Sequence, residues 1–122
     1  MKKNIILIEK SNVVFHLLKE KFKTCFKNKI NVLRYNTSSQ CSSNNDNCDL
    51  YIYDYENSHE DFREFMKYLK LKSNDKKQTL IFSSMLNDEN YNDLDEFKDE
   101  FIKFSKYNDL DKKIKETLKI IQ

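Results

Sequence analysis

The sequence predicts an α/β domain: a five-stranded parallel sheet in the order 2-1-3-4-5, with helices on both faces and a second helix that is short or missing. Two observations lead to this fold class. Short apolar runs, which are typical of buried strands, alternate along the chain with segments whose apolar residues recur at helical spacing. The first, third and fourth runs are the most apolar, and this strand order places them inside the sheet.

Length and composition favour a single domain over residues 1–122. The chain is long enough for one hydrophobic core. Its 22 basic and 20 acidic side chains nearly balance, so we expect neither direct nucleic-acid binding nor membrane association. The apolar run after Met1 is too short for a signal peptide. Three cysteines without a CxxC pair argue against a disulfide framework or a zinc site, and they favour the cytoplasm.

The first half of the chain predicts strands at residues 4–8 and 30–35. The first run, NIILI, is continuous and buried, whereas the second, INVLRY, mixes polar and apolar residues as an edge strand does. Between them Ser11 caps a helix. Its apolar stripe comprises Val14, Leu18, Phe22 and Cys25, with Leu17 and Phe26 beside it. Residues 36–47 contain no large apolar side chain, which indicates a loop or at most a short helix.

The third strand is expected at residues 50–53, where the run LYIY leads directly into Asp54. Residues 58–61 (SHED) resemble a capping box at the start of the next helix. The core-facing stripe of that helix is Phe62, Phe65, Met66 and Leu69.

Two more strands are expected at residues 79–82 (TLIF) and 101–104 (FIKF). The acidic segment 88–100 between them has apolar residues at helical spacing and is expected to be a helix. Asp109 then caps a last helix. Its apolar positions are Leu110, Ile114, Leu118 and Ile121.

Polar side chains stand where each buried strand ends. They are Glu9, Lys10 and Ser11 after the first strand, Asp54, Tyr55 and Glu56 after the third, Ser83 after the fourth, and Ser105 and Lys106 after the fifth. The carboxyl ends of parallel strands meet at one edge of the sheet, where open α/β sheets place their sites. The sequence therefore predicts a site of acids, a hydroxyl and a lysine at this edge.

This ordered set resembles the receiver domains of bacterial response regulators across essentially the whole chain. In that family an acid pair follows the first strand, a phosphoacceptor Asp ends the third, a Ser or Thr ends the fourth, and a Lys follows the fifth. The matching segments are NIILIEKS, CDLYIYDYEN, TLIFSS and FSKYNDL. The resemblance implies that Asp54 is the phosphoacceptor, that Ser83 donates to the phosphoryl oxygens and that Lys106 offsets their charge.

Function follows from the same resemblance. It implies a receiver in two-component phosphorelay signal transduction, with a histidine kinase or another signalling protein as partner. Transcription regulation is expected if an output domain has been left out of this chain.

The resemblance also implies a magnesium site at Glu9 and Asp54, and because the family's metal takes a backbone carbonyl at position 56, the Glu56 side chain is a third candidate ligand. This chain departs from the family beside it, because Lys10 replaces the usual second acidic ligand. We therefore expect an atypical receiver whose Mg²⁺ binding is weak or absent. Lys10 is placed to pair with Asp54 or Glu9 and to replace the metal electrostatically. Tyr107 is a second departure, since proline usually follows the lysine.

A homodimer is a further expectation, because receivers often pair through the face formed by the fourth helix, the fifth strand and the fifth helix. Residues 88–100 carry seven acids and one lysine, whereas residues 103–119 carry six lysines and three acids. A two-fold axis can set the acidic helix of each subunit against the basic helix of the other.

Two alternatives remain open. The chain can be a pseudo-receiver that is not phosphorylated and serves as a docking or dimerisation module. A less favoured alternative is a small phosphatase of the haloacid-dehalogenase type, which uses an Asp at a strand end and a second Asp two residues on. Here Glu56 takes that second position, and Asp54 follows the third strand rather than the first. We therefore expect a signalling domain rather than an enzyme.

Overall fold

The computed structural model describes residues 2–42, 48–56, 59–71, 78–83 and 101–120. Five parallel strands form one sheet in the order β2-β1-β3-β4-β5, as the sequence predicts. The strands are β1 (Lys3–Ile8), β2 (Ile30–Tyr35), β3 (Leu50–Asp54), β4 (Gln78–Ser83) and β5 (Ile102–Lys106). The helices are α1 (Asn12–Phe26), α2 (Ser38–Ser42), α3 (His59–Leu71), the 3₁₀ turn η2 (Tyr107–Asp109) and α4 (Leu110–Leu118).

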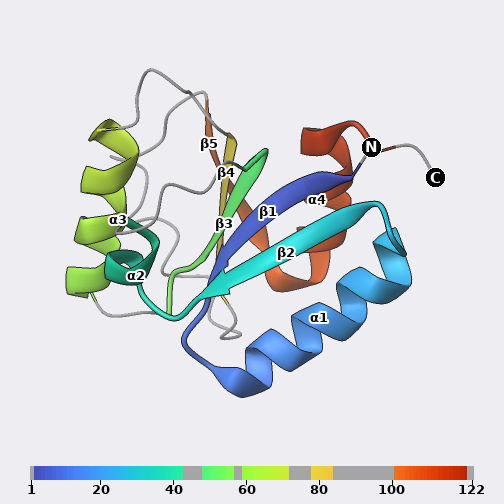
Figure 1. Cartoon of the computed structure of the whole chain (residues 1–122), viewed down its shortest axis with the longest axis horizontal. Coiled ribbons are helices and arrows are strands. Elements are labelled where there is room, and N and C mark those ends of the chain that lie inside the picture. The colour runs from blue at the N-terminus through green and yellow to red at the C-terminus, as the bar shows by residue number, and fades with distance from the viewer. Residues whose placement is uncertain (1, 43–47, 57–58, 72–77, 84–100, 121–122) are drawn as a thin grey trace.

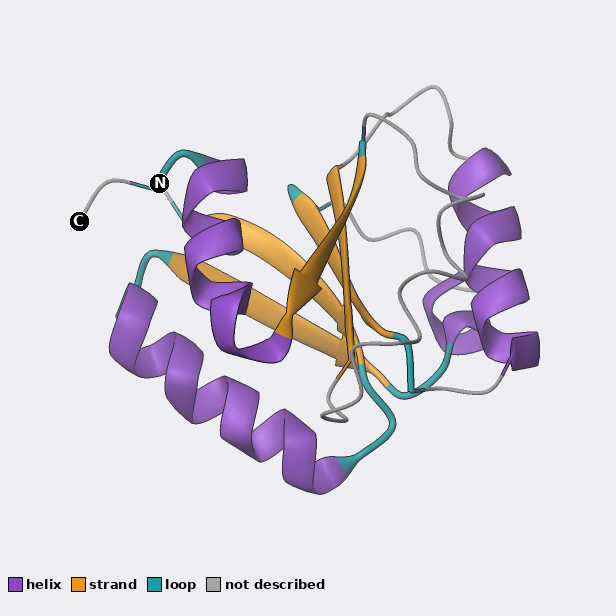
Figure 2. Ribbon diagram, turned by 180° about the vertical axis from the view of Figure 1, so that it is seen from behind, coloured by secondary structure: helices purple, strands orange, loops and turns teal. Residues whose placement is uncertain are grey.

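Helices cover both faces of the sheet. Figure 1 shows α2 and α3 on one side and α1 and α4 on the other, and Figure 2 shows the same layers from behind. Strand residues point alternately to the two sides, so Ile6 and Tyr53 pack toward α3, whereas Leu7 and Ile52 pack toward α1 and α4. The prediction of a doubly covered sheet is confirmed, and so is the short second helix, since α2 spans only five residues.

Burial separates the central strands from the edges. Every residue of β3 is buried, and so are five of the six in β4, which explains their continuous apolar runs. No residue of β2 is fully buried, in agreement with the predicted edge strand. On the other edge, β5 has two buried residues, Ile102 and Ser105, among more exposed ones.

Helix α1 begins as predicted, because the Ser11 hydroxyl accepts a hydrogen bond from the Val14 amide at 3.2 Å. Leu18, Phe22 and Phe26 form its buried face. Leu17, placed beside that stripe in the sequence, is 57% exposed, since it lies next to Leu18 in the helix and points about 100° away from it.

Three boundary predictions are corrected. Strand β5 ends at Lys106 rather than at residue 104, because its pairing with β4 continues as far as Ser83. Strand β3 includes Asp54. Asp109 occupies the N-cap position of α4 without a side-chain capping bond, since a 3₁₀ turn leads into the helix there.

Some predictions lie outside the described residues: Ser58 of the expected capping box, the acidic segment 88–100 and Ile121. Within the described residues, no helix is both long enough and apolar enough to cross a membrane.

Candidate functional site

The register of the sheet brings the predicted site residues to one edge. Tyr53 pairs with Ile8, the residue before Glu9, and Asp54 pairs with Phe82, the residue before Ser83. On the next strand Ser83 pairs with Lys106. Two backbone hydrogen bonds fix the ends of these strands: the Glu9 amide donates to Tyr35 O at 2.9 Å, and the Tyr55 amide donates to Phe82 O at 2.7 Å.

Glu9 and Asp54 form a buried pair of carboxyl groups, each only 1% exposed. Burial raises the pKa of Glu9 to about 9, and the hydrogen bond to Asp54 and the charge of Asp54 add to that shift. The Ser11 amide, which donates to Glu9 Oε1 at 3.0 Å, acts in the opposite direction. At neutral pH the Glu9 carboxyl therefore holds a proton.

One carboxyl oxygen of this pair, Glu9 Oε2, could bind a cation. Glu9 Oε2 is buried, and no donor among the described residues reaches it. A buried carboxyl oxygen without a donor is costly unless a proton or a metal ion meets it. Together with Asp54 it offers two hard oxygen ligands, which fit Mg²⁺ or Mn²⁺.

Glu56, the third expected metal ligand, is engaged elsewhere. Its carboxylate accepts a short hydrogen bond from the Ser83 hydroxyl, and its amide donates to Asp54 Oδ1 at 3.1 Å. Across the described parts of the chain, no three acidic, His or Cys side chains converge as a metal cluster. Glu9 and Asp54 are therefore the two carboxyl groups here that could hold a metal ion, and Glu56 binds the Ser83 hydroxyl beside them.

Lys10 does not neutralise the acid pair. Its side chain is exposed, and the ion pairs found among the described residues do not include it. The expectation that Lys10 pairs with Asp54 or Glu9 is therefore wrong for this conformation. Directly after Glu9 the chain leaves the sheet, which leaves the ammonium group in water, where it is well solvated.

Arg34 provides the positive charge that the sequence analysis missed. Its Nε donates to the Glu9 carbonyl at 2.9 Å, and its guanidinium lies 4.5 Å from the centre of the Phe15 ring. Its charge lowers the pKa of Glu9, against the larger effect of burial. The pairing of the first two strands would have pointed to this contact, because Arg34 pairs with Leu7, two residues before Glu9.

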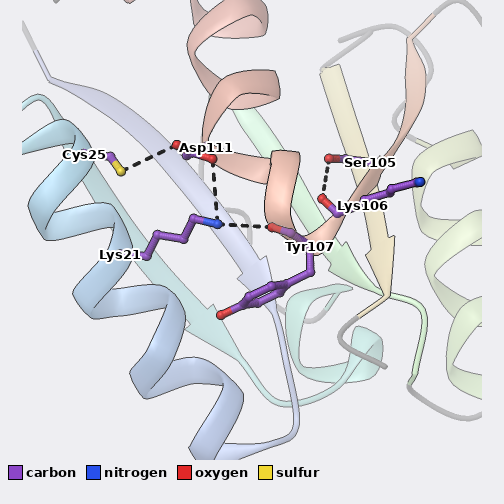
Figure 3. Close-up of polar contacts among 6 residues, drawn as sticks. All are labelled: Lys21, Cys25, Ser105, Lys106, Tyr107 and Asp111. Carbon is purple, nitrogen blue, oxygen red and sulfur yellow. Dashed lines mark hydrogen bonds and ion pairs between the residues drawn. The ribbon is translucent and has the colours of Figure 1, made fainter. Parts of the chain in front are cut away.

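Lys106 lies at the end of β5, and its side chain is exposed. The Ser105 hydroxyl donates to the Lys106 carbonyl at 2.9 Å (Figure 3). In the same view the Lys106 side chain extends away from Tyr107, on the opposite side of the strand. Lys103, an earlier lysine of β5, pairs with Leu80 and so lies three residues back from the carboxyl edge.

No protein-family model and no curated protein matches the sequence. Solved structures do resemble the chain. The receiver domain of the Francisella response regulator 1452 superposes with a TM-score of 0.72 at 16% identity, over 97% of this chain and 98% of that one. A CheY-like receiver domain protein from Methanospirillum hungatei gives 0.71 at 17% identity, over 98% and 95%.

A third similar structure was determined with a metal ion. The Mn²⁺-bound form of the response regulator Rcp1 has a TM-score of 0.66 at 16% identity, over 93% of this chain and 90% of that one. The three structures superpose on at least 93% of this chain. The chain therefore has the fold of the response regulator receiver domains.

Proposed function

We propose that this chain is a receiver domain of two-component signal transduction and that Asp54 accepts the phosphoryl group. One observation carries the proposal: Asp54 ends the central strand as a buried carboxylate, with Glu9, Ser83 and Lys106 brought to the same edge by strand register. A phosphohistidine of a histidine kinase or a small acyl phosphate would be the donor.

In the proposed reaction an Asp54 carboxylate oxygen attacks the phosphorus atom of the donor. A new O–P bond forms, the bond to the donor breaks, and the leaving group departs with that electron pair. Lys106 offsets the charge of the transferred group. Ser83 donates to a phosphoryl oxygen after it exchanges its hydrogen bond from Glu56 to the new acceptor.

Glu9 and Asp54 would hold the divalent metal, and Glu56 could join them only if its carboxylate left the Ser83 hydroxyl. A metal bound there supplies positive charge that offsets the phosphoryl oxygens. Glu9 must release its proton for the metal to enter, so proton and metal compete for the same oxygen. This competition, together with a lysine at position 10, supports the expectation of weak metal binding.

Two observations favour a second candidate, a pseudo-receiver that docks or dimerises without phosphorylation. Lys10 stands where the resembling family has an acidic ligand, and the Glu9 proton already neutralises one carboxyl group. Either function would use a signalling partner, and the homodimer through the acidic and basic segments remains compatible with both.

The two candidates differ in one measurement. The protein is incubated with acetyl phosphate and Mg²⁺, and its intact mass is recorded. Phosphorylation predicts a gain of one phosphoryl group, which Asp54→Asn abolishes and Asp49→Asn, an exposed acid at the opposite end of β3, does not. No gain at any Mg²⁺ concentration, in folded protein, supports the docking module instead.

A further inference from the structure

Tyr107, the residue after Lys106, is held by a set of contacts that have no role in the proposed reaction. Tyr107 begins the η2 turn, directly after the end of β5. A proline there would fix the backbone dihedral φ covalently, but the sequence contains no proline. The direction in which the chain leaves β5 must therefore be fixed by contacts.

The Leu110 amide donates to the Tyr107 carbonyl within the turn, and Lys21 of α1 makes the side-chain contacts that hold it from outside. Its Nζ donates to the Tyr107 carbonyl at 3.2 Å and lies 4.9 Å from the centre of the Tyr107 ring. The same Nζ lies 3.7 Å from Asp111 Oδ1 in the first turn of α4. Figure 3 shows Lys21 reaching from α1 to both groups. One ammonium group thus binds the residue after β5 and the helix that follows it.

Lys21, Tyr107 and Asp111 together form a clamp between α1 and the start of α4, and the remaining contacts connect this clamp to its surroundings. The Cys25 thiol, one helical turn after Lys21, donates to Asp111 Oδ2 at 3.7 Å. The Tyr107 ring lies 6.2 Å from the ring of Phe82, the residue that precedes Ser83 and pairs with Asp54. Burial raises the pKa of Tyr107, so its ring stays neutral at physiological pH. The clamp therefore contacts both strands that carry Ser83 and Lys106.

We propose that Lys21 is a positioning residue, which acts through Tyr107 to direct Lys106 toward the phosphoryl site. This inference rests on the proposed function. Lysine has a long flexible stem, so the direction of its backbone decides where its ammonium group reaches. A displacement of about 1 Å in such a group can cost a reaction a large part of its rate. Lys21 holds the neighbouring peptide group and thereby limits that displacement.

A first experiment needs no phosphorylation. NMR follows the side-chain and amide signals of Lys106 in wild type, Lys21→Met and Lys23→Met. Methionine keeps an apolar stem and removes the charge, and Lys23 is an exposed lysine on the same helix. Lys21→Met should shift the Lys106 signals and speed amide exchange at residues 106 and 107, whereas Lys23→Met should not. Lys106 signals identical to wild type in Lys21→Met would overturn the inference.

A second experiment tests the effect on the reaction by a double-mutant cycle. Lys21→Met should lower the initial rate of phosphoryl uptake from acetyl phosphate by roughly tenfold. The same change in a Lys106→Ala background should have no further effect, because no ammonium group is left to position. Lys21→Arg, which can also donate to the Tyr107 carbonyl and stack on the ring, should recover part of the rate.

The outcomes separate the two proposals. An equal loss of rate in both backgrounds would mean that Lys21 only braces the fold, and it would overturn the inference. If no variant takes up a phosphoryl group, the proposed function fails, and the NMR comparison alone decides whether Lys21 positions Lys106.

Discussion

At the scale of single residues, the chemistry of the site depends on two carboxyl groups that share one buried place. Burial and the neighbouring charge of Asp54 disfavour a charged Glu9, and the charge of Arg34, which contacts the Glu9 backbone, acts in the opposite direction. A proton on Glu9 resolves the conflict. A metal bound at the proposed site would therefore compete with this proton for the same carboxyl group.

The raised pKa of Glu9 predicts how stability depends on pH. Between about pH 4.5 and about pH 9 the folded protein holds a proton on Glu9 that the unfolded chain has lost. The stabilisation from this group is therefore complete below about pH 4.5 and disappears as pH rises to about 9. Urea unfolding from pH 5 to pH 9 should show this loss in wild type, and Glu9→Gln should flatten it.

Glu20→Gln is the matched control, because it makes the same chemical change at an exposed position on α1. It should leave the pH dependence of stability as in wild type. Parallel curves for wild type and Glu9→Gln would contradict the assignment of the buried proton to Glu9.

The charge of the side chain at position 10 should determine how strongly the proposed site binds a metal ion. Lys10→Asp removes a positive charge and adds a carboxylate next to Glu9, so the affinity for Mn²⁺ should rise by about tenfold or more. Calorimetric titration measures the change. Lys3→Asp makes the same change of charge at the start of β1, the opposite end of the strand, and should have little effect. Equal gains in both variants would mean that net charge alone is responsible.

At the scale of elements, one acid of α3 bonds the start of the short helix α2. The Asp61 carboxylate accepts hydrogen bonds from the Ser38 amide at 2.8 Å, the Ser38 hydroxyl at 2.9 Å and the Tyr53 hydroxyl at 2.6 Å. Five residues are too few for a stable isolated helix. Asp61 therefore holds α2 against the sheet.

Asp61→Ala should destabilise the fold by about 1–3 kcal/mol, because it leaves a buried Ser38 and the Tyr53 hydroxyl without their acceptor. Hydrogen exchange should show the amides of α2 opening first. Glu60→Ala removes a neighbouring exposed acid from the same helical turn and should cost much less. Equal losses in the two variants would mean that the charge near the helix start matters, not the tether.

The strands and helices can be predicted from the sequence more reliably than the contacts between them. Apolar runs and helical spacing predict the strand order and the two-sided covering, because burial on both faces leaves a direct mark in residues such as Leu50 and Ile52. No comparable sequence pattern indicates the hydrogen bonds of Asp61 to Ser38 and Tyr53. The bond to Ser38 joins residues 23 positions apart, and only the packing of α2 on α3 brings them together.

The same distinction applies to the site. Strand ends predict where Glu9, Asp54, Ser83 and Lys106 lie. Lys10 is exposed, whereas Arg34 reaches Glu9. This difference depends on the direction of each side chain once the strands are in place. Spacing along the chain does not contain that information.

At the scale of the whole molecule, the opposite charges of residues 88–100 and 103–119 predict a homodimer. The acidic segment 88–100 lies outside the described residues, so the homodimer remains a prediction. If acidic and basic segments of two subunits pair, sedimentation should show a dimer at low salt that dissociates as ionic strength rises. A monomer at both salt concentrations, in concentrated protein, would remove the hypothesis. A dimer that is indifferent to salt would place apolar surface at the interface.

The location of the phosphoryl group decides whether Asp54 is the phosphoacceptor. Protein treated with acetyl phosphate and Mg²⁺ is digested at low pH, and the modified peptide is sequenced by mass spectrometry. We predict modification of Asp54, at the buried end of β3, and its loss in Asp54→Asn. Modification of another residue, or none in protein shown to be folded and to bind Mg²⁺, would contradict it.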